Sequence, residues 1–265
     1  MGRYQTLFAA LQETGKKAFI PFTVLGYPHQ DASFELIQTL VDNGASALEL
    51  GFAFSDPMAD GTIIQRADHD LLAAGYTVEE ALQLLKRVRD YAPDIPIGLL
   101  VYYNMMLARG IDAFCRDVQA AGADGILVAD LPPELMQEVT PACQAHQLDL
   151  ISMVSPLTSD DRLQAVLQHA GGFLYVVSRL GITGVEERYD EQLAALLSRL
   201  HAQTSLPCCV GFGISRPEHA EKMIELGADG VIVGSRIVQL IQDTPFSECH
   251  QALAAYMQSM AAVCA

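Results

Sequence analysis

The stretch AGADGILVA, residues 121–129, decides the fold, because its pattern recurs at two other places in the chain. NGASALELG at 43–51 and LGADGVIVG at 226–234 share its design of a glycine, a small residue and a short apolar run. Glycine suits the left-handed position that follows a helix C-terminus, and a short apolar run is typical of a buried strand. Each copy therefore predicts a joint at which a helix stops and a strand starts.

Short apolar runs rich in β-branched residues recur along the whole chain and predict eight strands. They cover residues 18–25, 47–51, 96–102, 125–129, 148–153, 173–177, 207–210 and 230–233. Stretches with apolar residues at helical spacing lie between them, at 34–42, 78–90, 111–120, 133–146, 160–169, 191–202 and 217–226. Thr77-Val78-Glu79-Glu80 and Ser215-Arg216-Pro217-Glu218 also match the capping box of a helix start.

This alternation predicts parallel pairing, because each helical crossover returns the chain to the same edge of the sheet. Eight such units close into a (β/α)8 TIM barrel, an α/β fold that we expect as a single domain over residues 1–265. An open doubly wound sheet is the alternative, but no G-x-G-x-x-G fingerprint follows the first strand. Two extra helices are expected, one at 2–13 that caps the lower end of the barrel and one at 246–264.

The composition excludes several classes of protein. With 51% hydrophobic residues in 265, the chain can bury a core and is not a disordered protein. Its 32 acidic and 16 basic residues give a net charge of -16, which argues against binding to nucleic acids or anionic membranes. No apolar run is long enough for a signal sequence or a membrane span, so a cytoplasmic location is expected.

The cysteines show no pattern of a disulfide framework or a zinc finger. All six, at 115, 143, 208, 209, 249 and 264, lack a C-x-x-C pair and are expected to be reduced packing residues. Cys208 and Cys209 are adjacent, so their side chains should point to opposite faces of a strand. A zinc ion shared by these two residues is therefore not expected.

Two carboxylates lie where (β/α)8 barrels carry their reactive groups, which is at the C-terminal ends of strands and in the loops that follow them. Glu49 occupies a position at which the other two copies of the repeat have Leu127 and Ile232. Burial of an unpaired carboxylate is costly, which favours a functional role over a glutamate that faces a helix and pairs with Lys or Arg. Asp60 alone would be interpreted as a turn residue, but its proximity to Glu49 favours a shared site.

Glycines end the last two predicted strands, in Gly211-Phe212-Gly213-Ile214-Ser215 and Gly234-Ser235-Arg236, and each segment leads into a helix. Glycine lets a ligand oxygen approach the backbone, and N–H groups at a helix N-terminus attract anions. A tight connection between a strand and a helix would explain the glycines of either segment alone equally well. Two such segments after consecutive late strands favour a phosphate site. The connection 178–185 is compatible with a mobile lid and equally with an ordinary long loop.

In combination these motifs closely resemble the α subunit of tryptophan synthase, from Arg3 to about Val238. The resemblance rests on residues 48–51, 54–57, 59–61, 179, 181, 183–184, 211–215 and 234–235. It implies a (β/α)8 barrel that cleaves indole-3-glycerol phosphate to indole and glyceraldehyde 3-phosphate. It also implies an α2β2 heterotetramer, in which a pyridoxal-phosphate (PLP) β subunit receives indole through a tunnel for L-tryptophan synthesis. No metal or organic cofactor is expected in this chain.

The resemblance also implies roles for individual residues. Glu49 looks like the family's acid/base carboxylate, and Asp60 like the carboxylate that faces the indole N–H. The implied substrate-binding residues are an apolar wall (Phe22, Leu100, Leu127, Ala129 and Tyr175), a lid threonine that meets Asp60 (Thr183) and a phosphate set (Gly184, Gly213, Gly234 and Ser235). The implied contacts with the β subunit are Asp56, Pro57, Asn104 and Pro132. The chain lacks two prolines that the family usually has, at 53 and 62, so the loop that carries Asp60 should have more freedom in the unfolded state.

The implied reaction fits these residues chemically. Cleavage of the bond between indole C3 and the glycerol chain needs a proton delivered to C3 and another removed from a hydroxyl group, and one carboxyl group can serve both steps. Apolar neighbours should raise the pKa of Glu49 and keep it protonated near neutrality. Asp60, in a more polar loop, should stay ionised and stabilise positive charge on the ring nitrogen.

Three other functions are considered from the sequence. A sugar-phosphate aldolase of the Schiff-base type would need a buried lysine at a strand end, whereas every lysine of this chain falls in or beside a predicted helix. A regulatory subunit that has lost turnover is disfavoured by the presence of both Glu49 and Asp60. A free-standing indole-releasing lyase would differ from the family only in its indifference to a β subunit.

Overall fold

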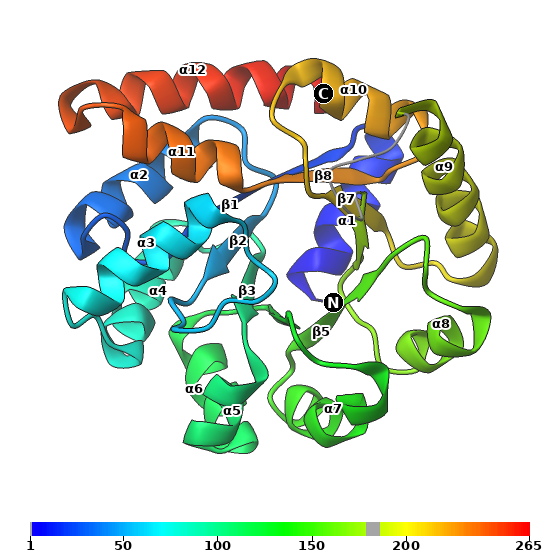
Figure 1. The fold of residues 1–265 in the computed structure, drawn as a ribbon, viewed down its shortest axis with the longest axis horizontal. Helices are drawn as coiled ribbons and strands as arrows, with labels where there is room; N and C mark the ends of the chain where they lie inside the picture. The colour runs from blue at the N-terminus through cyan, green and yellow to red at the C-terminus, as the bar shows by residue number, and fades with distance from the viewer. Residues whose placement is uncertain (1, 179–185) are drawn as a thin grey trace.

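The computed structural model describes residues 2–178 and 186–265, and these form a closed barrel of eight parallel strands inside a layer of helices (Figure 1). The strands follow one another around the barrel in sequence order, and the last pairs with the first. Their bounds are Ala18–Val24 (β1), Leu48–Gly51 (β2), Ile97–Val101 (β3), Gly125–Val128 (β4), Asp149–Val154 (β5), Leu174–Val177 (β6), Cys208–Gly211 (β7) and Gly230–Val233 (β8). The predicted (β/α)8 fold is confirmed, and each strand end lies within one residue of its predicted position.

Helices cover the outside of the barrel (Figure 1). The first helix, α1, lies across the end at which the strands begin, which we call the lower end. The bounds are Arg3–Thr14 (α1), Gln30–Asp42 (α2), Thr62–Ala73 (α3), Val78–Tyr91 (α4), Tyr103–Arg109 (α5), Ile111–Ala121 (α6), Met136–Ala145 (α7), Asp160–Leu167 (α8), Glu186–Gln203 (α9), Pro217–Glu225 (α10), Ser235–Asp243 (α11) and Phe246–Cys264 (α12), with a 3₁₀ turn at Pro133–Leu135 (η1). No helix among these residues is long and apolar enough to cross a lipid bilayer.

Helix starts were predicted less well than strands. The capping box at Thr77 is confirmed, because its backbone N–H donates to Glu80 Oε2 at 2.8 Å and its Oγ1 accepts from the Glu80 N–H at 3.2 Å. The one predicted at Ser215 is wrong, since Arg216 is the N-cap of α10 and makes no side-chain capping bond. The sequence did not predict α3 and α5, whose N-caps, Gly61 and Tyr102, also lack a side-chain capping bond.

The three repeated joints have the predicted backbone. Gly44, Gly122 and Gly227 follow α2, α6 and α10 with φ angles of +102°, +112° and +107°. A side chain is strained in this left-handed region, which explains the glycine at each joint. Because the joints fix where β2, β4 and β8 begin, they also fix which side chains face the interior of the barrel.

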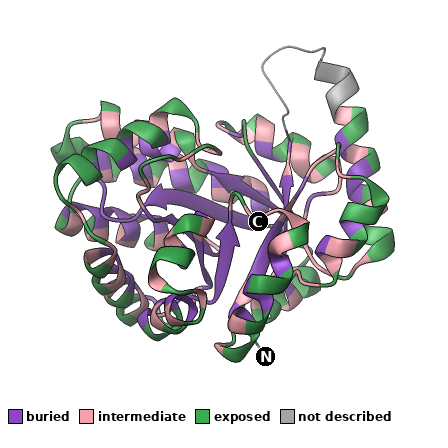
Figure 2. Ribbon diagram, turned by 60° about the horizontal axis from the view of Figure 1, so that its bottom comes forward, coloured by how far each residue is buried: buried purple, intermediate pink, exposed green. Residues whose placement is uncertain are grey.

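Apolar side chains form one layer on each side of the strands, and most strand residues are buried (Figure 2). Leu127, Ile151 and Ile232 belong to the interior cluster, which Tyr4 and Phe8 of α1 close from below. The predicted capping role of α1 is therefore confirmed. The larger outer cluster packs the strands against the helices and includes Leu48, Leu50, Leu99, Val176 and Val210.

The cysteines behave as predicted. All six are buried and free. Cys208 packs in the outer layer and Cys209 in the interior, so their side chains point to opposite faces of β7. Cys115 Sγ and Cys143 Sγ lie 4.0 Å apart between α6 and α7.

Candidate active site

Glu49 lies on β2 inside the barrel, where only 3% of its surface is exposed. Its neighbours in register are Phe22 on β1 and Gly98 on β3. Burial raises the pKa of Glu49 to about 8, and the nearby charge of Asp60 adds to this rise. The carboxyl group is therefore mostly protonated at neutral pH, as expected from its apolar surroundings.

Asp60 lies in the loop between β2 and α3, and a tyrosine holds its side chain in place. The Tyr102 hydroxyl donates a hydrogen bond of 2.6 Å to Asp60 Oδ2 and accepts one of 3.1 Å from the Ala59 N–H. Tyr102 is 1% exposed, and its ring stacks on Phe54 with 4.9 Å between the centroids. This short bond to a hydroxyl donor favours the charged form of the carboxylate.

The side chain of Asp60 is partly buried. Burial raises its pKa, while the hydrogen bond from Tyr102 lowers it. The hydroxyl group of the buried Tyr102 supplies a polar contact to the Asp60 carboxylate. Tyr102 was not among the predicted site residues, although its position directly after β3, at the end of the barrel that carries reactive groups, is a signal that could have found it.

A third carboxyl group, Asp68, lies close to Asp60 and was also missed. It belongs to the buried face of α3 and is 4% exposed. Burial, with the charge of Asp60 as a smaller cause, raises the pKa of Asp68 to about 8. Glu49 and Asp68 therefore hold protons at neutral pH. Asp60, which accepts the hydrogen bond from Tyr102, is the group best placed to hold the negative charge.

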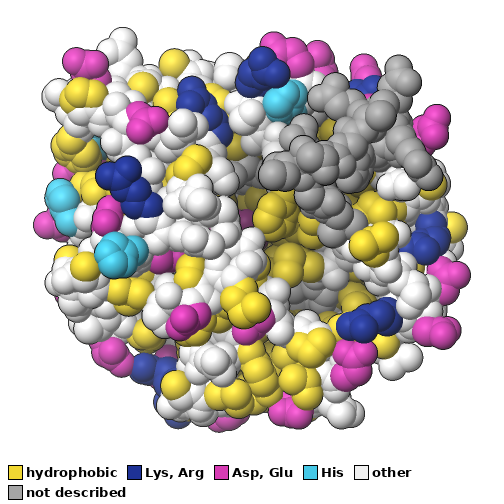
Figure 3. Space-filling model, in the orientation of Figure 1, with side chains coloured by type: hydrophobic (Ala, Val, Ile, Leu, Met, Phe, Trp, Pro, Cys, Tyr) yellow, Lys and Arg dark blue, Asp and Glu magenta, His cyan; other side chains and the backbone are white. Residues whose placement is uncertain are grey.

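The structure brings most of the predicted apolar wall together at the mouth of the barrel. Leu127 and Tyr175 belong to the interior cluster, and Leu100 and Ala129 pack against it. Burial raises the pKa of Tyr175, and the nearby carboxyl groups of Glu49 and Asp60 are smaller causes, so its ring lies near both groups. Figure 3 shows hydrophobic side chains gathered in a hollow near the middle of this face.

Two glycines make room for Phe22, the remaining member of the wall. A Cβ atom added at Gly51 would lie 2.8 Å from the Phe22 ring, and one at Gly234 would lie 3.0 Å from it. In the same way, a Cβ atom at Gly211 would collide with the Tyr175 hydroxyl. Gly211 and Gly234 are therefore required by the packing of aromatic rings, which is a reason that the sequence did not reveal.

The predicted phosphate residues that the structure describes lie after β7 and β8. Gly213 is exposed and has a φ angle of +77°, and the preceding Phe212 also has a positive φ of +69°. Gly234 is the N-cap of α11, and Ser235 is its exposed first residue. The first N–H groups of a helix have no partner within it, so this end of α11 offers donors to an anion. Thr183 and Gly184 lie outside the described residues, as does the predicted lid except for its first residue, Ser178.

The positions expected at a partner interface lie together at the same end of the barrel. Asp56 and Pro57 follow β2, Asn104 is on α5 after β3, and Pro132 precedes η1 after β4. Exposed apolar side chains occur on the segments after β2, β3 and β5, with exposed fractions of 86% for Met58, 49% for Leu107 and 79% for Leu157. Met58 and Leu107 belong to segments that follow neighbouring strands, and contiguous exposed apolar area is typical of a protein interface.

Comparisons with known proteins agree with this geometry. The family model of the tryptophan synthase alpha chain matches residues 8–264. A tryptophan synthase alpha chain from Methanothermobacter thermautotrophicus is 49% identical over 224 residues, which cover 84% of this chain and 83% of the relative. One from Vibrio cholerae is 41% identical over 263 residues and 98% of both chains.

Solved structures show the same likeness. A crystal structure of tryptophan synthase subunit alpha from Legionella pneumophila superposes with a TM-score of 0.91 at 36% identity, over 99% of this chain and 98% of that one. A chain of tryptophan synthase from M. tuberculosis, in an aminoacrylate-bound form, gives a TM-score of 0.88 at 30% identity over the whole of both chains.

Proposed function

The chain belongs to the tryptophan synthase alpha chain family, whose lyase reaction cleaves indole-3-glycerol phosphate, and from this premise we propose that Glu49 and Asp60 carry out the cleavage. The observation that carries the proposal is a carboxyl group buried at 3% exposure, whose pKa rises to about 8, near a carboxylate that accepts a 2.6 Å hydrogen bond from Tyr102. Two carboxyl groups in different protonation states can act as a proton donor and an electrostatic stabiliser in one reaction.

The proposed reaction starts with transfer of the Glu49 proton to C3 of the indole ring. Positive charge then develops on the ring nitrogen, and the Asp60 carboxylate stabilises it and accepts the N–H hydrogen bond. The ionised Glu49 removes the proton of the hydroxyl group on the carbon attached to C3. As that carbon becomes an aldehyde, the electron pair of the broken carbon–carbon bond returns to the ring. Indole and glyceraldehyde 3-phosphate leave, and Glu49 is protonated again.

The remaining predicted residues suit the other parts of the substrate. Leu100, Leu127, Ala129 and Tyr175, together with Phe22, would contact the flat apolar ring of indole. Gly213, Gly234 and Ser235, with Gly184 as a further member, would bind the phosphate through backbone N–H groups and one hydroxyl group. Neutral donors of this kind explain how a chain with a net charge of -16 can bind a phosphate ester. We assign Thr183 to the lid.

Replacing Gly213 with valine tests the phosphate site. The side chain would occupy the space beside the backbone that phosphate needs, so we expect KM for indole-3-glycerol phosphate to rise about tenfold or more, with a smaller change in kcat. Gly15→Val is the matched control, because Gly15 has a similar φ angle of +70° and no neighbour within 4 Å of an added Cβ atom, but lies at the lower end of the barrel. An unchanged KM for Gly213→Val, or an equal rise in both variants, would show that phosphate binds elsewhere.

We also propose that the chain works with a PLP-containing β subunit, in an α2β2 heterotetramer. Asp56, Pro57, Asn104 and Pro132 would form the contact, and Met58, Leu107 and Leu157 supply exposed apolar area at the same end of the barrel. Indole released near this face would pass to the PLP of the partner without entering the solvent.

Steady-state cleavage of indole-3-glycerol phosphate, measured with and without added β subunit, tests the function as a whole. We expect the isolated chain to release indole slowly and the complex to release it many times faster. If neither sample releases indole, the chain is a regulatory subunit without turnover. Equal rates in the two samples would instead indicate a free-standing lyase.

A further inference from the structure

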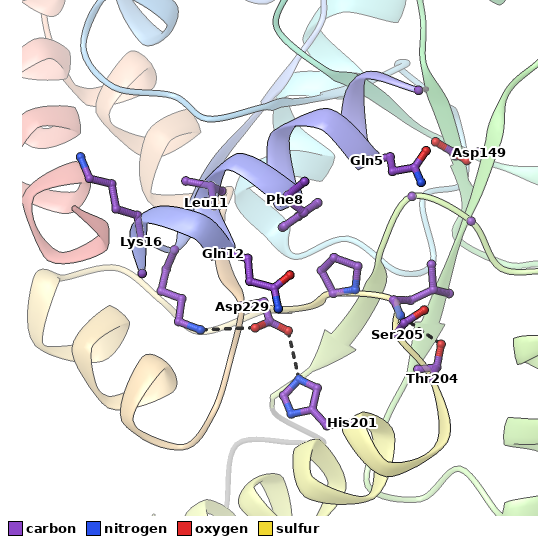
Figure 4. A pocket seen from close by; sticks show the side chains of 18 residues that line it. Gln5, Phe8, Leu11, Gln12, Lys16, Asp149, His201, Thr204, Ser205 and Asp229 are labelled. Atoms are coloured by element: carbon purple, nitrogen blue, oxygen red, sulfur yellow. Dashed lines mark hydrogen bonds and ion pairs between the residues drawn. The ribbon is translucent and has the colours of Figure 1, made fainter.

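A cluster of three potential metal ligands lies at the lower end of the barrel, opposite the proposed active site. His201 is near the end of α9, Cys208 begins β7, and Asp229 immediately precedes β8. One ligand atom from each, an imidazole nitrogen, the Cys208 sulfur and an Asp229 carboxylate oxygen, lies within 4.8 Å of the other two. Figure 4 shows His201 and Asp229 pointing toward one another at the edge of a cavity.

The barrel itself fixes two of these residues. The Asp229 N–H donates to the Cys208 carbonyl at 2.8 Å, and the Cys208 N–H donates back to Asp229 Oδ2 at 3.0 Å. The Asp229 carbonyl in turn accepts from the Ala18 N–H at 2.9 Å. Ligands that rigid elements hold in place form more precise sites than ligands on loops. His201 completes the group from the neighbouring helix, with its Nε2 3.0 Å from Asp229 Oδ2.

We propose that His201, Cys208 and Asp229 bind one Zn²⁺ ion. Zinc prefers a tetrahedral set of nitrogen, sulfur and oxygen ligands at about 2.0–2.3 Å, so its ligand atoms lie roughly 3.3–3.8 Å from one another. The ligand atoms lie at most 4.8 Å apart, so the widest separation needs to shrink by about 1–1.5 Å at most to reach this geometry. Thiolate and imidazole ligands favour zinc over magnesium or calcium.

The cavity in Figure 4 provides both access and a fourth ligand. It has a volume of about 770 Å³, and His201 and Asp229 line it together with Pro207, the residue before Cys208. The Cys208 side chain is fully buried, so its sulfur would be the innermost ligand. A water molecule from the cavity would complete the tetrahedron, as in zinc sites with three protein ligands.

Lys17 competes with a metal ion at this place. Its Nζ lies 3.3 Å from Asp229 Oδ1, the carboxylate oxygen on the side away from His201. About a third of each side chain of this pair is exposed, so the ammonium group can turn toward water when a cation binds. The alternative is that Asp229 only pairs with Lys17 and His201 and binds no metal. Removal of the lysine separates the two explanations, because it should strengthen metal binding only if the three residues form a metal site.

Titration of the metal-free full chain with Co²⁺, a spectroscopic substitute for Zn²⁺, tests the proposal. We expect one equivalent to bind with visible absorption typical of tetrahedral cobalt and a near-ultraviolet charge-transfer band from the Cys208 thiolate, and Zn²⁺ to abolish both signals. Cys208→Ser should lose the charge-transfer band. His201→Gln, a change at a side chain that is 40% exposed and so leaves the fold intact, should weaken binding at least about tenfold.

Two matched variants serve as controls, and a third separates the explanations. Cys249→Ser removes another buried thiol, and His250→Gln another histidine near a carboxylate, Glu35, at 3.5 Å. Both should bind Co²⁺ as the parent chain does. Lys17→Met should tighten binding by about threefold to tenfold, because a competing positive charge is gone. The absence of a charge-transfer band in the parent chain, or its persistence in Cys208→Ser, would overturn the proposal.

Discussion

Replacement of Glu49 by glutamine is expected to lower kcat for cleavage of indole-3-glycerol phosphate by at least about 10³-fold. The amide has nearly the same shape as the protonated carboxyl group but can neither deliver a proton to C3 nor remove one from the substrate hydroxyl. Both transfers therefore lose their catalyst, while the apolar wall and the phosphate site are unchanged. Indole release measured over a range of substrate concentrations should show the loss in kcat, with KM changed much less.

The stability of the same variant separates loss of chemistry from loss of fold. The pKa of Glu49 rises from its usual value near 4.5 to about 8 in the folded chain, because the side chain is buried. Between these two pH values the folded state binds a proton that the unfolded state has released, so the parent chain loses stability as the pH rises. Glutamine has no such proton. Glu49→Gln should therefore match the parent chain near pH 4.5 and exceed it at pH 8 by up to roughly 4 kcal/mol.

Urea unfolding at the two pH values measures this difference. A misfolded or loosely packed variant would instead be less stable than the parent chain at both. Substantial turnover by a Glu49→Gln variant that shows the expected stability profile would remove Glu49 from the proposed reaction.

Glu49 could be found in the sequence because its position is set by a local pattern. The repeat aligns it with Leu127 and Ile232, and the structure places both of these in the interior of the barrel. A strand alternates its side chains between two faces, so a residue in register with two interior residues must also face inward. Local patterns of this kind predicted all eight strands and the barrel.

The surroundings of Asp60 could not be found in this way, because they depend on contacts between distant segments. Tyr102 is 42 positions from Asp60 in the chain and reaches it from the end of the neighbouring strand, β3. Asp68 was missed because the N-cap of α3 is a glycine, which makes no side-chain capping bond, so the sequence did not predict the helix that buries it. The cluster of His201, Cys208 and Asp229 is a similar case, since its members come from three separate segments.

Replacement of Asp60 by asparagine is expected to lower kcat by about 10²–10³-fold. The amide oxygen can still accept a hydrogen bond from the indole N–H, but it has no charge to stabilise the positive ring that forms when C3 is protonated. The loss should therefore appear in kcat and in kcat/KM, with little change in the binding of inorganic phosphate as a competitive inhibitor.

Asp68→Asn is the matched control, because it also changes a buried carboxyl group of the same cluster to an amide. Asp68 has a pKa of about 8 and is mostly neutral at pH 7, so its replacement removes little charge. We expect kcat to change by less than about threefold, which is typical of a substitution that takes no charge from the reacting atoms. If Asp68→Asn lost as much activity as Asp60→Asn, the negative charge that stabilises the ring would be shared by Asp60 and Asp68.

Tyr102→Phe completes the argument, since it keeps the ring that stacks on Phe54 and removes only the hydroxyl group that donates to Asp60. Without this donor the pKa of Asp60 should rise, because the hydrogen bond that favours its charged form is gone. As the pH is lowered, the cleavage rate of Tyr102→Phe should therefore begin to fall at a higher pH than the rate of the parent chain does. If the acidic side of the pH–rate profile is the same in both chains, Tyr102 only packs the site, and other groups set the charge on Asp60.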